Sequence, residues 1–330
     1  MSEARGGSLP AAVPDGEALG PPDDRTLEFV HHVQAGGKVE AGDWMPADYR
    51  QELIRLVAMH AASELMGVLP EKEWVPRAPG LHRKLALMAK VQDEAGHGQI
   101  LMRVAEDLAA PLGKSREDLL DDLFAGRIRF HNVFHMPAPT WADAGIIGWL
   151  VDGAAIVTQG MLLSTSYAPY ARALERICAE EVFHIQHGES ICMALAEGTP
   201  GQRRMLQEAL ERWWDALLMF FGPPQGHRLS THQERNLRYR IRTRTNEELR
   251  QRFLSKYVPR IRALGLRIPD ETLRYDESQG MWVYRQPDWE LFRQIVSGRG
   301  PRSEARMNLR RLAYEEGRWV RECLAGARAA

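Results

Sequence analysis

Two copies of one short motif, Glu-x-x-His, constrain the fold of this 330-residue chain more than any other feature. The copies are Glu94-Ala-Gly-His97 and Glu181-Val-Phe-His184. Residues three apart on an α-helix lie on one face, so each copy can direct a carboxylate and an imidazole toward one point. A single copy is usually part of a solvated helix face, but two copies 87 residues apart predict a shared site.

A lone carboxylate precedes each motif by nearly the same number of residues. Glu64 lies 30 residues before Glu94, and Asp152 lies 29 residues before Glu181. One acid from each of two helices, with a Glu-x-x-His from each of two others, is the ligand layout of di-iron and di-manganese sites in four-helix bundles. Asp152 interrupts the apolar run 148–157, where a charge needs a counter-charge or a metal. The predicted metal ligands are Glu64, Glu94, His97, Asp152, Glu181 and His184, and the four carboxylates are also the predicted catalytic residues.

Other polar residues lie beside these ligands in the sequence. Asp93 and Glu180 each precede a motif glutamate, and they are candidates to accept hydrogen bonds from the ligand histidines. His60 lies one helical turn before Glu64 and could compete for its place. Lys90 lies one turn before Glu94, where it can reach either an anionic group of a substrate or a carboxylate of the site.

The spacing of apolar residues predicts an all-α protein, a ferritin-like four-helix bundle with additional C-terminal helices and a small β-hairpin. Pro70 is expected to end the first long helix, and a capping box of Ser115 with Asp118 to begin the third helix. Helices are expected over residues 48–68, 82–108, 115–126, 141–166, 170–197, 201–221, 245–264 and 302–327, with a loop over 222–232 and a hairpin within 266–289. Three regions follow: a disordered tail over 1–25, a di-iron bundle over 26–200, and a helical extension packed on it over 201–330.

Composition narrows the environment and the partners. With 43 basic and 44 acidic residues, the chain has no charge excess that would indicate a nucleic acid or a membrane surface as partner. No run of about 18 apolar residues indicates a membrane span. The N-terminus lacks a basic start followed by an apolar run, so no secretory signal is expected. The three cysteines form no CxxC motif, which favours a reducing, cytoplasmic compartment.

Several longer strings resemble the oxygenase alpha subunits of bacterial phenylacetyl-CoA epoxidases, and the resemblance runs from about residue 40 to 322. The strings are Lys90-Val-Gln-Asp-Glu-Ala-Gly-His-Gly98, Ile147-Gly-Trp-Leu-Val-Asp-Gly-Ala-Ala-Ile156, Ser166-Tyr-Ala-Pro-Tyr-Ala-Arg172, Asp43-Trp-Met-Pro46, Asn246-Glu-Glu-Leu-Arg-Gln-Arg-Phe253 and Glu315-Glu-Gly-Arg-Trp-Val-Arg321. The resemblance implies a di-iron monooxygenase that epoxidises the aromatic ring of phenylacetyl-CoA with dioxygen and electrons from NADPH, in aerobic phenylacetate catabolism. It also implies the same six metal ligands as the motif spacing.

The resemblance implies partners and substrate-binding residues as well. The partners would be a related helical subunit without metal ligands, a small bridging subunit, and a reductase carrying FAD and a [2Fe-2S] cluster on a separate chain. Lys90 matches a family lysine near the metals and the thioester, and Arg129 lies where the family tends to have a basic residue for the coenzyme A phosphates. The N-terminal tail and the loop 223–232 differ from the family pattern. These differences bear on how the subunits assemble more than on the reaction that the resemblance implies.

Several other functions are compatible with parts of this pattern. A ribonucleotide reductase small subunit or an acyl desaturase would share the metal site, but the radical enzyme needs a tyrosine near the metal, and Tyr167 and Tyr170 lie about four turns beyond Asp152. An iron-storage protein would not need the long C-terminal region. A metal-free structural subunit would not need all six ligands. A benzoyl-CoA epoxidase is the nearest enzymatic alternative, and only a comparison of substrates separates it from the first reading.

Overall fold

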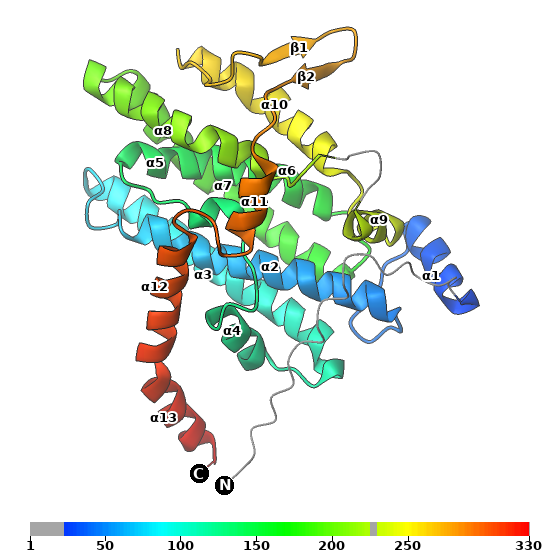
Figure 1. Ribbon diagram of the computed structural model, residues 1–330. Helices are drawn as coiled ribbons and strands as arrows, with labels where there is room; N and C mark the ends of the chain where they lie inside the picture. The colour runs from blue at the N-terminus through cyan, green and yellow to red at the C-terminus, as the bar shows by residue number, and fades with distance from the viewer. Residues whose placement is uncertain (1–22, 225–229, 330) are drawn as a thin grey trace.

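The computed structural model describes residues 23–224 and 230–329 (Figure 1). The predicted disordered tail lies outside this part of the chain except for its last three residues. These three already belong to a helix start: Asp23 caps α1 (Asp24–Gln34), and its carboxylate accepts a hydrogen bond from the amide of Thr26 at 2.8 Å. The helix thus begins just inside the range expected for the tail.

Four long helical segments lie together and carry the predicted ligands (Figure 1). They are α2 (Ala47–Lys72), α3 (Leu81–Ala109), the run α5 (Trp141–Ile146), η3 (Ile147–Val151) and α6 (Asp152–Leu162), and α7 (Ala168–Ala196). Apart from the polar cluster described below, their inward faces are mostly apolar and buried, as the spacing of three and four predicts. The sheet found in the described residues is one short hairpin, so the prediction of an all-α bundle with a small hairpin is confirmed.

The first bundle helix does not end at Pro70, as the sequence predicted, but continues to Lys72. Only Glu71 and Lys72 follow Pro70 in α2, so the helix continues for less than one turn after the proline, which lacks the N–H of a backbone hydrogen bond. The continuation places Glu71 inside the protein, with 1% of its surface exposed. This residue contributes to the site described below.

The helix that leads to Asp152 contains a π-helical turn, Ile147–Val151, which the sequence analysis did not anticipate. It also ends at Leu162 rather than near Ser166. A π turn holds one residue more than an α turn, so it rotates the residues that follow it relative to a regular helix. Asp152 is the first residue after the π turn, and this rotation therefore sets the direction of its side chain.

The π turn packs against α7 through two glycines. A Cβ atom at Gly188 would overlap the carbonyl carbon of Gly148 and the amide nitrogen of Trp149. A side chain at Gly148 would in turn press on the backbone of Gly188 at 3.0 Å. The absence of side chains at both positions allows the two ligand helices to approach this closely.

Replacing Gly188 with alanine is expected to destabilise the protein by about 1–3 kcal/mol, because the overlap is with backbone atoms that cannot rotate away. Urea unfolding of the metal-free protein measures this effect. Gly96→Ala is the matched control, since nothing lies within 4 Å of its added Cβ. We expect the control to be neutral or slightly stabilising. Equal stability of the two variants would contradict the close packing of α5–α6 on α7.

The remaining elements lie around the bundle, with α8, α10 and the hairpin on one side, α4 on the opposite side and α1 at one end (Figure 1). The helix α8 contacts α5 and α7, and α10 contacts α6. The capping box predicted at Ser115 and Asp118 is present at the start of α4. The bounds are η1 Ala110–Leu112, α4 Arg116–Phe124, η2 Asn132–His135, α8 Pro200–Met219, α9 Thr231–Arg238, α10 Asn246–Ala263, β1 Arg274–Asp276, β2 Met281–Val283, α11 Trp289–Val296, α12 Ser303–Glu316 and α13 Arg318–Ala329.

Three C-terminal predictions differ from the structure. Helix α9 begins at Thr231, within the expected loop, whose residues 225–229 lie outside the described chain. Helix α11 was not predicted. The expected last helix is two helices, α12 and α13, separated at Gly317, a residue type that weakens helix interiors. In Figure 1 these two helices extend away from the bundle toward the C-terminus.

Two described helical segments are long and apolar enough, by length and composition alone, to cross a membrane, although charged residues interrupt the apolar run in both, as expected. They are Ala47–Lys72 and Trp141–Leu162, in which 61% and 72% of the apolar window is buried inside the protein. Both carry predicted metal ligands inward, and their apolar character is that of core helices.

Candidate metal centre

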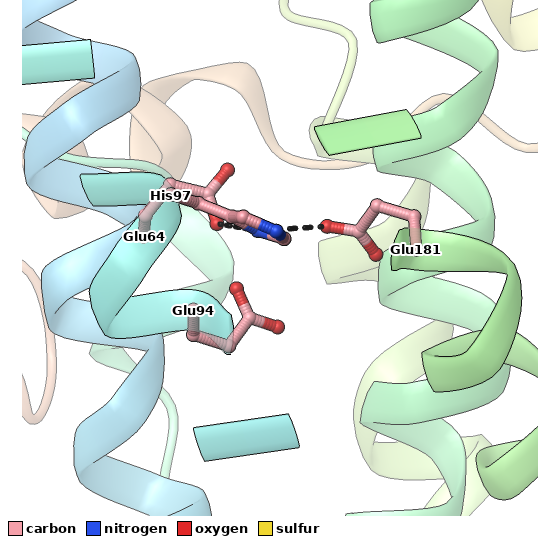
Figure 2. A group of neighbouring side chains, drawn as sticks. All are labelled: Glu64, Glu94, His97 and Glu181. Carbon is pink, nitrogen blue, oxygen red and sulfur yellow. Dashed lines mark ion pairs between the residues drawn. The ribbon is translucent and has the colours of Figure 1, made fainter. Parts of the chain in front are cut away.

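The structure brings all six predicted metal ligands together in the centre of the bundle. Glu64 comes from α2, the first Glu-x-x-His from α3, Asp152 from the start of α6, and the second Glu-x-x-His from α7. All six are buried. Figure 2 shows Glu64, Glu94 and His97 on one side and Glu181 on the other, with their polar ends directed toward one another.

The ligand atoms form two overlapping groups. In one group, atoms of Glu64, Glu94, His97 and Glu181 all lie within 4.8 Å of one another. In the other group, the same limit holds for Glu94, Asp152, Glu181 and His184. The groups share the two motif glutamates, whose two oxygens each allow one carboxylate to bridge two ions. The arrangement is therefore compatible with a metal site, in which each group contributes one histidine and one carboxylate of its own beside the two shared glutamates.

The two histidines are oriented as metal ligands. Nε2 of His97 lies 2.8 Å from a carboxylate oxygen of Glu180, and Nε2 of His184 lies 3.3 Å from one of Asp93. Because a carboxylate only accepts, each Nε2 carries the proton in the ligating state, and each Nδ1 keeps a free lone pair. Within the described chain neither Nδ1 makes a hydrogen bond, and both face the ligand carboxylates at 3.3–3.8 Å.

These contacts confirm the predicted roles of Asp93 and Glu180 as hydrogen-bond acceptors. Each contact joins a residue of α3 to a residue of α7. Glu180 of α7 holds the histidine of α3, and Asp93 of α3 holds the histidine of α7. Glu180 is itself held by Arg176, whose Nε donates to its second oxygen at 2.9 Å.

We expect Glu180→Gln to weaken metal binding about 10- to 100-fold, because an amide can present its nitrogen to His97 and no longer stabilises the protonated Nε2 as a carboxylate does. Competition with a chromophoric iron(II) chelator under anaerobic conditions measures the change. Glu175→Gln is the control, since Glu175 is exposed on the same helix. An unchanged affinity in Glu180→Gln would mean that this contact does not orient the ligand.

Without a metal, the buried charges shift one another's pKa values. Burial raises the pKa of Glu181 and, more strongly, that of Asp152. Burial opposes the charged form of His97, but the nearby carboxylate of Glu64 raises its pKa to about 9. Burial also opposes the charged form of His184, but Glu181 and Glu94 raise its pKa to about 11. At neutral pH, protons on both histidines therefore balance part of the carboxylate charge.

Metal affinity should consequently depend on pH. A metal binds neutral imidazole, whereas His97 in the metal-free protein carries its extra proton below about pH 9. Binding must displace this proton, so affinity falls as pH falls, by at least about tenfold per unit between pH 7 and 8.5. The chelator competition repeated at three pH values in this range tests the slope. A pH-independent affinity would show that the histidines are neutral before the metal binds.

Lys90 lies inside the site, with 1% of its side chain exposed. Its Nζ is 2.6 Å from Glu71, 2.9 Å from Glu94 and 3.0 Å from Asp152. This is the pairing with site carboxylates that the sequence left open as the alternative to substrate contact. These three neighbours raise the pKa of Lys90 well above its ordinary value although burial opposes its charge, so it stays an ammonium ion.

Glu71 is the polar residue of this group that the sequence analysis missed. It lies seven residues, or two helical turns, after Glu64, which places both on one face of α2. The spacing was therefore a usable signal, and the assumption that Pro70 ends the helix concealed it. His60, considered as a rival of Glu64, instead bonds to it: its Nε2 lies 2.8 Å from a Glu64 oxygen.

Two further predictions concern residues around this cluster. Tyr170 was expected to lie far from the metal ligands, but its hydroxyl is 2.8 Å from Nδ1 of His60, because the chain reverses after α6 and α7 returns past α2. Arg129 is exposed and takes no part in the contacts of the cluster. Its neighbour Arg127 pairs with Asp122 at 2.5 Å. The role of Arg129 in phosphate binding stays a prediction.

Comparison with known proteins adds evidence of kinship. Residues 23–319 match the sequence model of a family described as "Phenylacetic acid catabolic protein". The chain is 48% identical, over 294 residues, to one subunit of the 1,2-phenylacetyl-CoA epoxidase of Escherichia coli strain K12. That alignment covers 89% of this chain and 93% of the relative.

Proposed function

Because the chain belongs to the phenylacetic acid catabolic protein family, we propose that it is the catalytic subunit of an epoxidase that acts on the aromatic ring of phenylacetyl-CoA. The observation that carries the catalytic assignment is the pair of four-residue groups that share Glu94 and Glu181. A chain that served only as a structural partner would have no reason to bury this complete donor set. The reaction makes the chain a monooxygenase of phenylacetate catabolism.

The six clustered residues are proposed to hold two iron ions, which would supply dioxygen activation. Glu64 and His97 belong to one position, Asp152 and His184 to the other, and Glu94 and Glu181 to both. Hydrogen bonds from the histidine Nε2 atoms keep the ligating nitrogens aimed inward. The low exposure of all six ligands keeps bulk water away from the reacting ring.

Lys90 and Arg129 are the proposed substrate contacts, with different support. The ammonium group of Lys90 is held by Glu94, Asp152 and Glu71, so it fixes the position and balances the charge of these carboxylates. A direct contact with the thioester stays a prediction. Arg129, on the exposed segment before η2, is proposed to bind a phosphate group of coenzyme A.

The E. coli relative is named as one subunit of an epoxidase, so a multisubunit enzyme is the premise for the partners. We propose that the chain acts in the cytoplasm with a related helical subunit without metal ligands, a small bridging subunit, and a separate reductase that passes NADPH electrons through FAD and a [2Fe-2S] cluster. Neither a nucleic acid nor a membrane is part of the proposed assembly.

The experiment that tests the function uses the chain co-purified with its partner subunits and reductase. After anaerobic iron loading, iron content, NADPH-dependent oxygen uptake and product formation are measured with phenylacetyl-CoA and with benzoyl-CoA. About two irons per chain with product from the first thioester is the expected result. Product from benzoyl-CoA alone would reassign the substrate. Failure to retain iron would overturn the catalytic assignment.

A further inference from the structure

Tyr170 is linked to the ligand cluster by two consecutive hydrogen bonds that the proposed function does not use. Its hydroxyl oxygen lies 2.8 Å from Nδ1 of His60, and Nε2 of His60 lies 2.8 Å from Oε1 of Glu64. Tyr170 is fully buried in the first turn of α7, and His60 stands one turn before Glu64 on α2. A phenol is thus two hydrogen bonds from a predicted metal ligand.

The direction of both hydrogen bonds follows from the chemistry of the groups. Burial raises the pKa of Tyr170 far above its ordinary value, so its hydroxyl is protonated. The carboxylate of Glu64 can only accept. In the tautomer of His60 that carries its proton on Nε2, Nδ1 accepts from the phenol and Nε2–H donates to Glu64. In this arrangement the phenolic proton points at the lone pair of Nδ1.

We propose that Tyr170 is a redox-active residue that gives one electron to the oxygen-oxidised metal centre when no substrate is present. The O–H bond of Tyr170 breaks, an N–H bond forms at Nδ1 of His60, the centre is reduced by one electron, and a neutral tyrosyl radical remains. One electron from the supply that serves the centre returns the proton and restores the phenol. The inference rests on the proposed function, which supplies the oxidant.

The proton acceptor is what distinguishes Tyr170. Removing an electron alone would leave a positive charge on the buried phenol, whereas proton transfer leaves a neutral tyrosyl ring and places the charge on His60, beside the carboxylate of Glu64. Tyr257 provides the comparison, since it is buried and packs over Gly153, the residue after Asp152. Its hydroxyl has no hydrogen-bond partner in the described chain. Tyr257 therefore lies near the predicted ligand Asp152, but no group in the described chain is placed to accept its phenolic proton.

The test is electron paramagnetic resonance of the complete enzyme after anaerobic iron loading and reduction. The samples are mixed with dioxygen in the absence of thioester and frozen within milliseconds to seconds. We expect a tyrosyl radical signal in the unmodified chain, with a hyperfine pattern that changes when the protein is made with ring-deuterated tyrosine. Tyr170→Phe should abolish this signal, and Tyr257→Phe should leave it unchanged.

Iron content and product formation from phenylacetyl-CoA are measured on the same preparations. These measurements distinguish a failure of the proposed function from a failure of the redox role of Tyr170. Bound iron and product without a tyrosyl radical would overturn the redox role of Tyr170 and leave the proposed function intact. A signal that persists in Tyr170→Phe and disappears in Tyr257→Phe would also overturn it. Absence of iron from the unmodified chain would remove the proposed function and this inference together.

Discussion

Replacing Lys90 with methionine is expected to destabilise the metal-free protein by about 3–5 kcal/mol, the usual cost of removing one partner from a buried ion pair. The change leaves Glu71, Glu94 and Asp152 without their shared cation, inside a site where no solvent can replace it. Methionine fills a similar volume, so the effect reports charge more than packing. Urea unfolding of the metal-free chain measures the loss.

The same variant should be less destabilised once iron is bound, because the ions supply positive charge to Glu94 and Asp152. Lys72→Met is the matched control, since Lys72 is exposed at the end of α2, and its effect is expected to stay within about 0.5 kcal/mol. Equal unfolding midpoints for Lys90→Met and the unmodified protein would mean that the carboxylates take up protons instead of depending on this lysine.

Replacing Glu94 with alanine is expected to abolish activity and to remove nearly all bound iron, because this carboxylate belongs to both ligand groups. The fold should largely persist, since the bundle core of aliphatic side chains is unaffected. Iron analysis after anaerobic loading, together with turnover of phenylacetyl-CoA, measures the first effect, and circular dichroism measures the second.

Glu175→Ala serves as the control for this substitution, because Glu175 is an exposed acid on α7 outside the cluster. It should keep full iron content and activity. If Glu94→Ala kept normal iron and turnover, the ligand set proposed from the motif spacing would be wrong. If it lost activity while keeping two irons, Glu94 would act in the reaction without being needed to hold the metal.

The six clustered residues could be predicted because the spacing of residues along a helix determines which side chains point the same way. Helix positions three apart lie on one face, so each copy of Glu-x-x-His predicted that its glutamate and its histidine point toward the same site. An acid such as Asp152 in an apolar helix is informative for a related reason, since its burial without a partner would be too costly. Local rules likewise placed the capping box at Ser115.

What the sequence did not reveal depends on long-range geometry or on small energy differences. The π turn before Asp152 costs little once α7 packs against it through Gly148 and Gly188, and no local pattern marks it. Pro70 was a misleading stop signal, because the helix continues for two residues beyond it although proline lacks the backbone N–H. Tyr170 was judged by its distance along the chain, whereas its contact with His60 arises from the way α7 returns past α2.

The hydrogen bonds by which α3 and α7 each orient the other's histidine have a consequence for metal loading of the proposed centre. If two ions bind as proposed, an ion held by His97 would also use Glu94 and Glu181 and would tighten the contact with Glu180, so these two carboxylates would already be ordered for the second ion. Occupancy of the two positions would then be thermodynamically linked, with each ion lowering the cost of ordering the other's ligands. Chains given too little metal should divide into empty and doubly filled molecules, with few that hold a single ion.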